Sequence, residues 1–216
     1  MIKNYFKTAW RSLWKNKTTS FINITGLAVG MAAAVLIFIW VQNEMNFDNY
    51  HKDADNIYRL TTNFKAQGWI WETSPLLLAG AVKNEVPEVE KVTRLYSGDM
   101  PVFNINNNLS YEKNCAFVDD DWFNIFNFDF IEGNAAAFAN DLNSIILTAS
   151  EAKKYFGKQD ALGKIIHADS LNYVVKGIIK DNPANSSFQY TAYIPLQNLL
   201  KNPDRKANDV QWGNDN

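Results

Sequence analysis

The chain has 216 residues, of which 47% are hydrophobic, with 21 basic residues, 23 acidic residues and one cysteine. Sixteen of the basic residues and all 23 acidic residues follow residue 43, and their net charge of −7 argues against nucleic acid as a partner. A single cysteine, Cys115, excludes an intramolecular disulfide, so a domain in this region must be held by its own hydrophobic core.

Residues 3–17 are predicted to form an amphipathic helix at a membrane surface. The basic residues recur every fourth position, and the aromatic and apolar residues also recur at helical spacing. These two rows are Lys3, Lys7, Arg11 and Lys15, and Tyr5, Phe6, Ala9, Trp10, Leu13 and Trp14. Such a helix can lie in the headgroup region with its aromatic face in lipid and its basic row on phosphates. The alternative is a positively charged flank without fixed structure.

Residues 21–42 are predicted to cross the membrane as one helix. No charged residue lies between Lys17 and Glu44, and the apolar stretch spans roughly 30 Å at 1.5 Å per residue. A buried core helix or a cleaved signal peptide are the alternatives. The stretch ends in bulky residues at 38–41 and lacks a small-residue cleavage site there, so we expect an uncleaved anchor.

The charges around this span predict its orientation. Five basic residues and no acidic residue precede it, which places the N-terminus in the cytoplasm and residues from about 43 onward outside. Trp10 and Trp14 suit the inner interface of the bilayer and Trp40 the outer one.

One face of the predicted span is lined by small residues. Gly26, Gly30 and Ala34 are spaced four residues apart, and small residues at this spacing let two transmembrane helices approach closely. We therefore expect a packing face here, although glycine is common in membrane helices without such a role.

Residues after 43 are predicted to alternate short strands with short helices, which indicates an α+β fold. Strands are expected at 56–64, 89–96, 115–118, 144–147 and 188–194, with hairpins formed by 102–105 with 109–111 and by 164–167 with 173–180. One helix is expected to start at Ser74-Pro75 and another to cover 121–126. A third should start at Thr148, through a capping box with Glu151, and end at Gly157.

No arrangement of residues typical of an enzyme is found in the sequence. Gly157 and Gly163-Lys164 resemble a phosphate-binding loop, but the glycines are too far apart and Ile165 stands where Ser or Thr would bind magnesium. His51 and His167 lack companion ligands for a metal. The run Asp119-Asp120-Asp121 is interpreted as a solvated turn and helix start. We expect no catalytic, cofactor-binding or metal-binding residue.

Several stretches together resemble FtsX/MacB-type ABC transporter permeases, especially the forms common in Bacteroidetes. The resemblance begins with residues 4–17 and 22–30 and continues in the same order as in that family. The later motifs are Glu44-x-x-Phe47-Asp48-x-Tyr50-His51, Ile57-Tyr58-Arg59, Pro87-Glu88-Val89-Glu90, Trp122-Phe123-x-Ile125-Phe126, Leu147-Thr148-x-Ser150-x-Ala152-x-x-Tyr155-Phe156-Gly157, Leu162-Gly163-Lys164 and Lys180-Asp181-x-Pro183-x-Asn185-Ser186.

This resemblance implies a cytoplasmic amphipathic helix at 1–20, a transmembrane helix at 21–42 and a periplasmic MacB-like core domain at 43–216. In that family the core domain combines a porter-like α/β subdomain with an inserted mixed subdomain. Family members continue with further transmembrane helices, so this sequence is expected to be incomplete at its C-terminus.

The resemblance also implies an inner-membrane permease subunit of an efflux-type transporter, which is not itself an enzyme. Its expected partners are an ABC ATPase, a second permease copy, membrane lipids, a periplasmic adaptor and an outer-membrane channel. A membrane-tethered periplasmic sensor or binding domain, and an FtsX-like regulator of cell-wall hydrolases, remain the alternatives. The substrate stays open among macrolides, peptides, lipoproteins and lipids.

Overall fold

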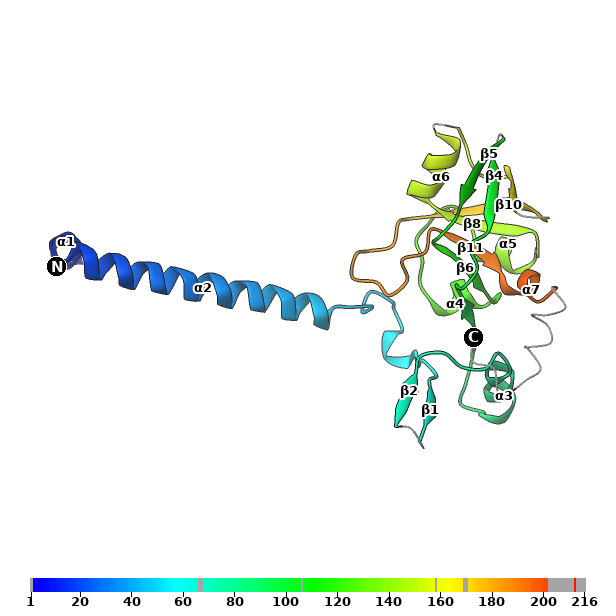
Figure 1. Ribbon diagram of the computed structural model, residues 1–216, viewed down its shortest axis with the longest axis horizontal. Coiled ribbons are helices and arrows are strands. Elements are labelled where there is room, and N and C mark those ends of the chain that lie inside the picture. Colours follow the sequence, from blue (N-terminus) through cyan, green and yellow to red (C-terminus); the bar gives the residue numbers. More distant parts are fainter. Residues whose placement is uncertain are drawn as a thin grey trace. The chain divides into compact units, whose positions relative to one another are not determined.

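The structure is a computed structural model that describes residues 2–65, 68–105, 107–157, 159–168, 171–201 and 212 (Figure 1). The side chains of residues 2 and 3 are outside this description. The chain divides into two compact units, Met1–Asn49 and Tyr50–Asn216.

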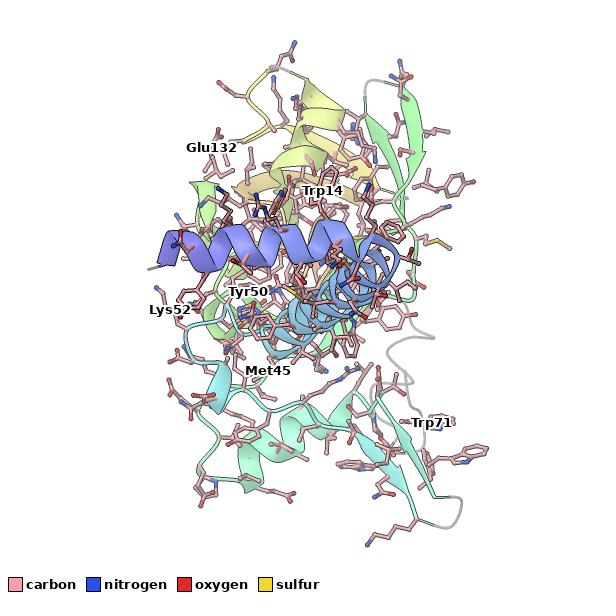
Figure 2. All side chains as sticks on the ribbon, turned by 90° about the vertical axis from the view of Figure 1, so that its left-hand side faces the viewer. Trp14, Met45, Tyr50, Lys52, Trp71 and Glu132 are labelled. Atoms are coloured by element: carbon pink, nitrogen blue, oxygen red, sulfur yellow. The ribbon has the colours of Figure 1, made fainter. Side chains whose placement is uncertain are left out.

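The first unit consists of two helices, α1 (Ile2–Lys15) and α2 (Lys17–Met45). Asn16 separates them because its backbone, at φ −111° and ψ 54°, leaves the helical region. Figure 2 shows α1 lying across the end of α2, which is seen nearly end-on. Among the described residues, α2 is the one helix long and apolar enough to cross a membrane, and none of its side chains is buried.

The second unit is built on a nine-stranded mixed sheet. Across the sheet the strands are β3 (Leu95–Tyr96), β6 (Cys115–Val118), β11 (Ala192–Pro195), β8 (Ser144–Thr148), β10 (Leu171–Ile179), β9 (Ile165–Ala168), β4 (Val102–Ile105) and β5 (Asn108–Tyr111). The ninth strand, β7 (Phe130–Gly133), pairs with β10. Two pairs are parallel, β6 with β11 and β8 with β10, and all the other pairs are antiparallel.

The long strand β10 joins the parts of this sheet. One edge pairs with β8, and the opposite edge pairs first with β9, through residues 171–174, and then with β7, through residues 177–179. The connection from β8 to β10 passes through α6 (Ala149–Phe156), as parallel strands require a crossover.

The core lies on both faces of the sheet, because neighbouring residues of a strand point to opposite sides. Ile145 and Leu147 of β8 belong to one hydrophobic cluster, which includes side chains of α6 and α7 (Leu196–Leu199). Ile146 belongs to the other, together with side chains of α4 (Trp122–Ile125) and α5 (Ala135–Ala139). All residues of β6, β8 and β11 are buried, as expected for strands covered on both faces.

A smaller set of elements lies between residue 50 and the sheet in sequence. It contains a short 3₁₀ helix η1 (Ala54–Asn56), the antiparallel strands β1 (Thr62–Phe64) and β2 (Trp69–Trp71), and α3 (Leu77–Glu85). None of the residues within these four elements is buried.

The predicted α+β class is confirmed, and so are the strand at 115–118, the strand at 144–147 and both predicted hairpins. Three strand predictions were too long: 56–64 is reduced to β1, 89–96 to β3, and 188–194 to β11. The remaining residues of these three stretches pair with no neighbouring strand, so their apolar pattern overstated the length of each strand. The turn residues Asn106, Asp169 and Ser170 lie outside the described residues.

Two helix starts differ from the prediction. Helix α3 begins at Leu77, with Leu76 rather than Ser74 at the N-cap position. Thr148 is the N-cap of α6 as predicted, but its side chain makes no capping bond. Asp181, from a distant part of the chain, accepts hydrogen bonds from the Ser150 N–H at 3.0 Å and its hydroxyl at 2.7 Å. The predicted end is confirmed, since Gly157 follows the last turn with φ 66°.

Candidate functional site

The chain continues from α2 through a short turn. The N–H of Phe47 donates to the carbonyl oxygen of Glu44 at 3.2 Å, and Asp48 has φ 56°, in the left-handed region. Aspartate tolerates this conformation better than most residues do. Only residues 46–49 therefore separate the end of α2 from Tyr50, the first residue of the second unit.

Tyr50 and His51 are anchored in the second unit by hydrogen bonds to distant residues. The Tyr50 and Ser186 hydroxyl oxygens are 2.8 Å apart. His51 is only 5% exposed, and its Nδ1 accepts a hydrogen bond from the backbone N–H of Asn127 at 3.2 Å. Since Nδ1 accepts, a neutral His51 carries its proton on Nε2. The segment after α2 is thus held to two separate loops of the sheet domain.

Aromatic rings surround His51 on several sides. Ring centroids of Tyr50, Phe126 and Phe188 lie 4.1, 5.1 and 6.2 Å from that of His51. The Trp122 ring lies 4.4 Å from Phe126 and 4.8 Å from Phe188. These tilted and edge-on contacts are the favourable arrangements for aromatic pairs. We call this group the aromatic cluster, and its members are Tyr50, His51, Trp122, Phe126, Phe128 and Phe188.

A second group of polar side chains, which we call the carboxyl cluster, joins α6 to the sheet. Its members are Glu112, Glu151, Lys154 and Tyr155. The Tyr155 hydroxyl donates to Glu112 Oε2 at 2.6 Å, and the Lys154 ammonium lies 2.5 Å from Glu151 Oε1 and 3.5 Å from Glu112 Oε2. Both glutamates are buried, whereas Lys154 is about half exposed.

The two carboxyls of this cluster have opposite pKa shifts. Burial would raise the pKa of Glu112, but hydrogen bonds from Tyr155, Glu151 and the Asn114 N–H, with the Lys154 charge, lower it overall. For Glu151, burial and the neighbouring Glu112 carboxyl raise the pKa more than Lys154 lowers it. Burial together with the adjacent Glu112 carboxylate also raises the pKa of the Tyr155 hydroxyl. One carboxyl is thereby favoured as an anion and the other as an acid.

The three aspartates at 119–121 make contacts that stabilise the fold. Asp119 accepts hydrogen bonds from the Arg94 backbone N–H and from its guanidinium at 2.8–3.0 Å. Burial, and then the neighbouring Asp119 charge, raise the pKa of Asp120. Asp121 is the N-cap residue of α4, as the sequence indicated. The run thus fixes β3 and α4 rather than forming a cation site.

The residues predicted to face the membrane all lie in the first unit. Lys7, Trp10, Arg11, Trp14 and Lys15 are exposed on α1, while the Lys3 side chain is outside the described residues. On α2, Cβ atoms added at Gly26 and Gly30 would meet no other atom within 4 Å, and Ala34 is exposed.

Within the described ranges, no group of three or more His, Cys, Asp or Glu side chains could hold a metal ion. His51 lies in the aromatic cluster, and the His167 ring on β9 contacts Asn172 of β10. The stretch that resembled a phosphate loop comes between α6 and β9, and the Gly163 N–H in it donates to the carbonyl oxygen of Val175 on β10 at 2.8 Å.

Comparison with protein families matches residues 20–212 to the MacB-like periplasmic core domain. The chain belongs to this family. The match covers most of the chain and confirms the resemblance to FtsX/MacB-type permeases. The chain therefore carries a MacB-like periplasmic domain behind a helix that can anchor it in a membrane.

Individual relatives are more distant. The pyoverdine export ATP-binding/permease protein PvdT of Pseudomonas syringae pv. syringae is 23% identical over 185 residues, which are 83% of this chain but 28% of that relative. A domain of a protein described as a permease from Porphyromonas gingivalis has the same fold, with a TM-score of 0.57 and 22% identity over 68% of this chain and 61% of that one.

Two further solved structures have lower scores. The periplasmic region of MacB from Actinobacillus actinomycetemcomitans has a TM-score of 0.48 with 16% identity, covering 60% of this chain and 58% of that one. The extracellular domain of the ABC-type transporter YknZ from Gram-positive bacteria has a TM-score of 0.48 with 18% identity, covering 61% and 67%.

Three motifs of the MacB-like sequence pattern meet in the aromatic cluster. Tyr50-His51 ends one of these motifs, Trp122 and Phe126 come from another, and Ser186, which is hydrogen-bonded to Tyr50, comes from a third. Sequence reasoning quoted these motifs separately and did not predict that they touch. The high aromatic content of residues 122–130 could have indicated such a cluster, because a short helix at the surface does not require so many aromatic side chains.

Proposed function

We propose that this chain is the permease subunit of an efflux-type ABC transporter in the inner membrane. In this proposal residues 1–20 lie on the cytoplasmic side, 21–42 cross the membrane and 43–216 form the periplasmic domain. The family match supports the periplasmic assignment, and the basic residues before the span support the orientation.

The aromatic cluster is the observation that carries the proposal. A permease that transmits motion needs a firm joint between its membrane helix and its outer domain. Here four residues separate α2 from Tyr50 and His51, which are hydrogen-bonded to Ser186 and Asn127 of the second unit. A longer connection could bend when the helix moves, and the outer domain would then stay where it was. A connection of four residues leaves little length to absorb such a displacement, and Tyr50 and His51, which follow it, are hydrogen-bonded to the loop before β11 and the loop after α4.

The energy for this motion is proposed to come from a separate ABC ATPase. The relative from Pseudomonas syringae is named as an ATP-binding/permease protein, which supports an ATP-binding partner for the present chain. Helix α1, with Lys3, Lys7, Arg11 and Lys15 on one row and Trp10 and Trp14 on another, is proposed to lie on anionic lipid beside that ATPase.

A second permease copy is proposed to pack against α2. Gly26, Gly30 and Ala34 leave one side of this helix open for close approach of another backbone. A periplasmic adaptor and an outer-membrane channel would complete an efflux assembly.

Affinity purification of the full-length protein from its native host tests the function. We expect an ABC ATPase to co-purify, with an adaptor and an outer-membrane channel if the assembly is an efflux pump. Recovery of a cell-wall hydrolase with the ATPase would point to hydrolase regulation. Recovery of neither, from membranes in which the protein is stable, would contradict a transporter role.

Lengthening the connection after α2 tests the joint. Inserting Gly-Ser-Gly-Ser between Asn46 and Phe47 should abolish any export phenotype of the intact transporter, because the added residues absorb the movement of α2. ATP hydrolysis and recovery of the ATPase should remain. The same insertion after Asn107, in the β4–β5 turn, is the matched control and should leave export unchanged. Full export by the first variant would show that the joint is not needed.

A further inference from the structure

The carboxyl cluster lies apart from the aromatic cluster and has no part in the proposed transport joint. Its buried glutamates come from two elements, since Glu112 follows β5 and Glu151 lies on α6. We propose that Glu112, Glu151 and Lys154 form a proton-dependent latch that holds α6 against the sheet. The latch is tight when the two carboxyls share one proton and weakens when both are ionised.

Glu112 is the fixed side of this latch. Its Oε1 accepts hydrogen bonds from the Thr191 hydroxyl at 3.1 Å and from the Asn114 N–H at 3.2 Å. Its Oε2 accepts from the Tyr155 hydroxyl at 2.6 Å. One carboxylate, only 3% exposed, therefore ties together the β5–β6 connection, the residue before β11 and helix α6. Three donors to one anion are enough to hold its charge away from water.

Glu151 is the side that titrates. It lies on α6 one turn before Lys154, whose ammonium is also within reach of Glu112. With both carboxyls ionised, one ammonium faces two anions and the buried group keeps a net charge of −1. A proton on Glu151 makes the group neutral and removes the repulsion between the carboxyls. Tyr155, with the Ser110 hydroxyl as a hydrogen-bond partner, is the other titratable group facing the pair.

The pKa directions give the sign of the pH dependence. The folded-state pKa of Glu151 lies above its usual value near 4.5, so its contribution to stability is full below that value and is lost as pH rises through the raised pKa. The folded-state pKa of Glu112 lies below the usual value, so its contribution is present above that value and is lost as pH falls. The two glutamates should therefore respond to substitution in opposite ways.

Thermal unfolding of the full chain in detergent micelles, followed between pH 4 and 8, tests the latch. Glu151→Gln should raise Tm relative to the unsubstituted chain, by a difference that grows as pH rises above 4.5 and reaches about 2–4 °C. Glu112→Gln should lower Tm, and this loss should also grow with pH. The matched control is Glu88→Gln, at an exposed position in the connection after α3, which should shift Tm equally at every pH.

Hydrogen exchange at pH 7.5 adds a local measurement. The amides of α6 should exchange several-fold more slowly in Glu151→Gln than in the unsubstituted chain. The glutamine carries no charge at this pH, so the repulsion that loosens α6 is removed. Glu88→Gln should leave them unchanged. A Glu151→Gln difference in Tm that does not vary with pH, or unchanged exchange in α6, would overturn the proposal. If Glu112→Gln fails to fold, the Glu151→Gln measurements decide alone.

Discussion

Replacing Trp122 with alanine should destabilise the sheet domain by about 3–5 kcal/mol, as expected when a large buried aromatic side chain is removed. Trp122 is 2% exposed, and its ring contacts Phe126, Phe188 and Tyr193 at centroid distances of 4.4, 4.8 and 6.4 Å. Its removal takes away the centre of the aromatic cluster and leaves a cavity between α4 and the sheet. Chemical denaturation of the full chain in detergent micelles, followed by near-ultraviolet circular dichroism, measures the loss.

The matched control for this substitution is Trp69→Ala. Trp69 lies on β2 and is 59% exposed, so removing it should change stability by less than about 1 kcal/mol. Equal losses for the two variants would mean that the Trp122 contacts contribute little beyond those of an exposed tryptophan. The aromatic cluster could then not act as the joint proposed between α2 and the sheet.

The elements that the sequence predicted well are determined by residues close together in the chain. The long apolar helix α2 was predicted from the absence of charged residues over 18–43, and the break between α1 and α2 occurs at a single polar residue, Asn16. Strands β6 and β8 were predicted within one residue, because each is a short apolar run bounded by polar residues. Local periodicity is enough for such elements.

The parts that were missed depend on residues far apart in sequence. The predicted capping box of α6 is replaced by Asp181, which lies 31 residues after Ser150 and reaches it only because β10 pairs in parallel with β8. The aromatic cluster likewise needs contacts between residues 50, 122 and 188. No spacing rule relates such positions, so a single sequence gives no means to predict either arrangement.

Strand β7 was also missed by the sequence analysis. Gly133, at its end, allows β7 to lie close to β10. Gly133 pairs with Gly177 of β10 and has φ 74°, a conformation that costs other residues roughly 1–2 kcal/mol. A Cβ atom at position 133 would also clash with the Lys176 carbonyl oxygen and lie 2.7 Å from Gly177 Cα. Gly133→Ala should therefore cost roughly 2–5 kcal/mol, the sum of the backbone strain and an overpacking penalty. Chemical denaturation of the full chain in detergent micelles measures this loss.

Gly157→Ala separates these two contributions. Gly157 also has a positive φ, 66°, with ψ −116°, but an added Cβ would meet no atom within 4 Å. Its substitution should cost only the strain of a positive-φ backbone, roughly 1–3 kcal/mol. The excess loss in Gly133→Ala then measures how tightly β7 packs on β10. Since β7 follows the aromatic residues 126 and 128 directly in the chain, a large excess means that this strand holds one side of the aromatic cluster in place. Equal losses would mean that β7 can move away from β10 at little cost, and that the cluster is held by α4 and the loop before β11 instead.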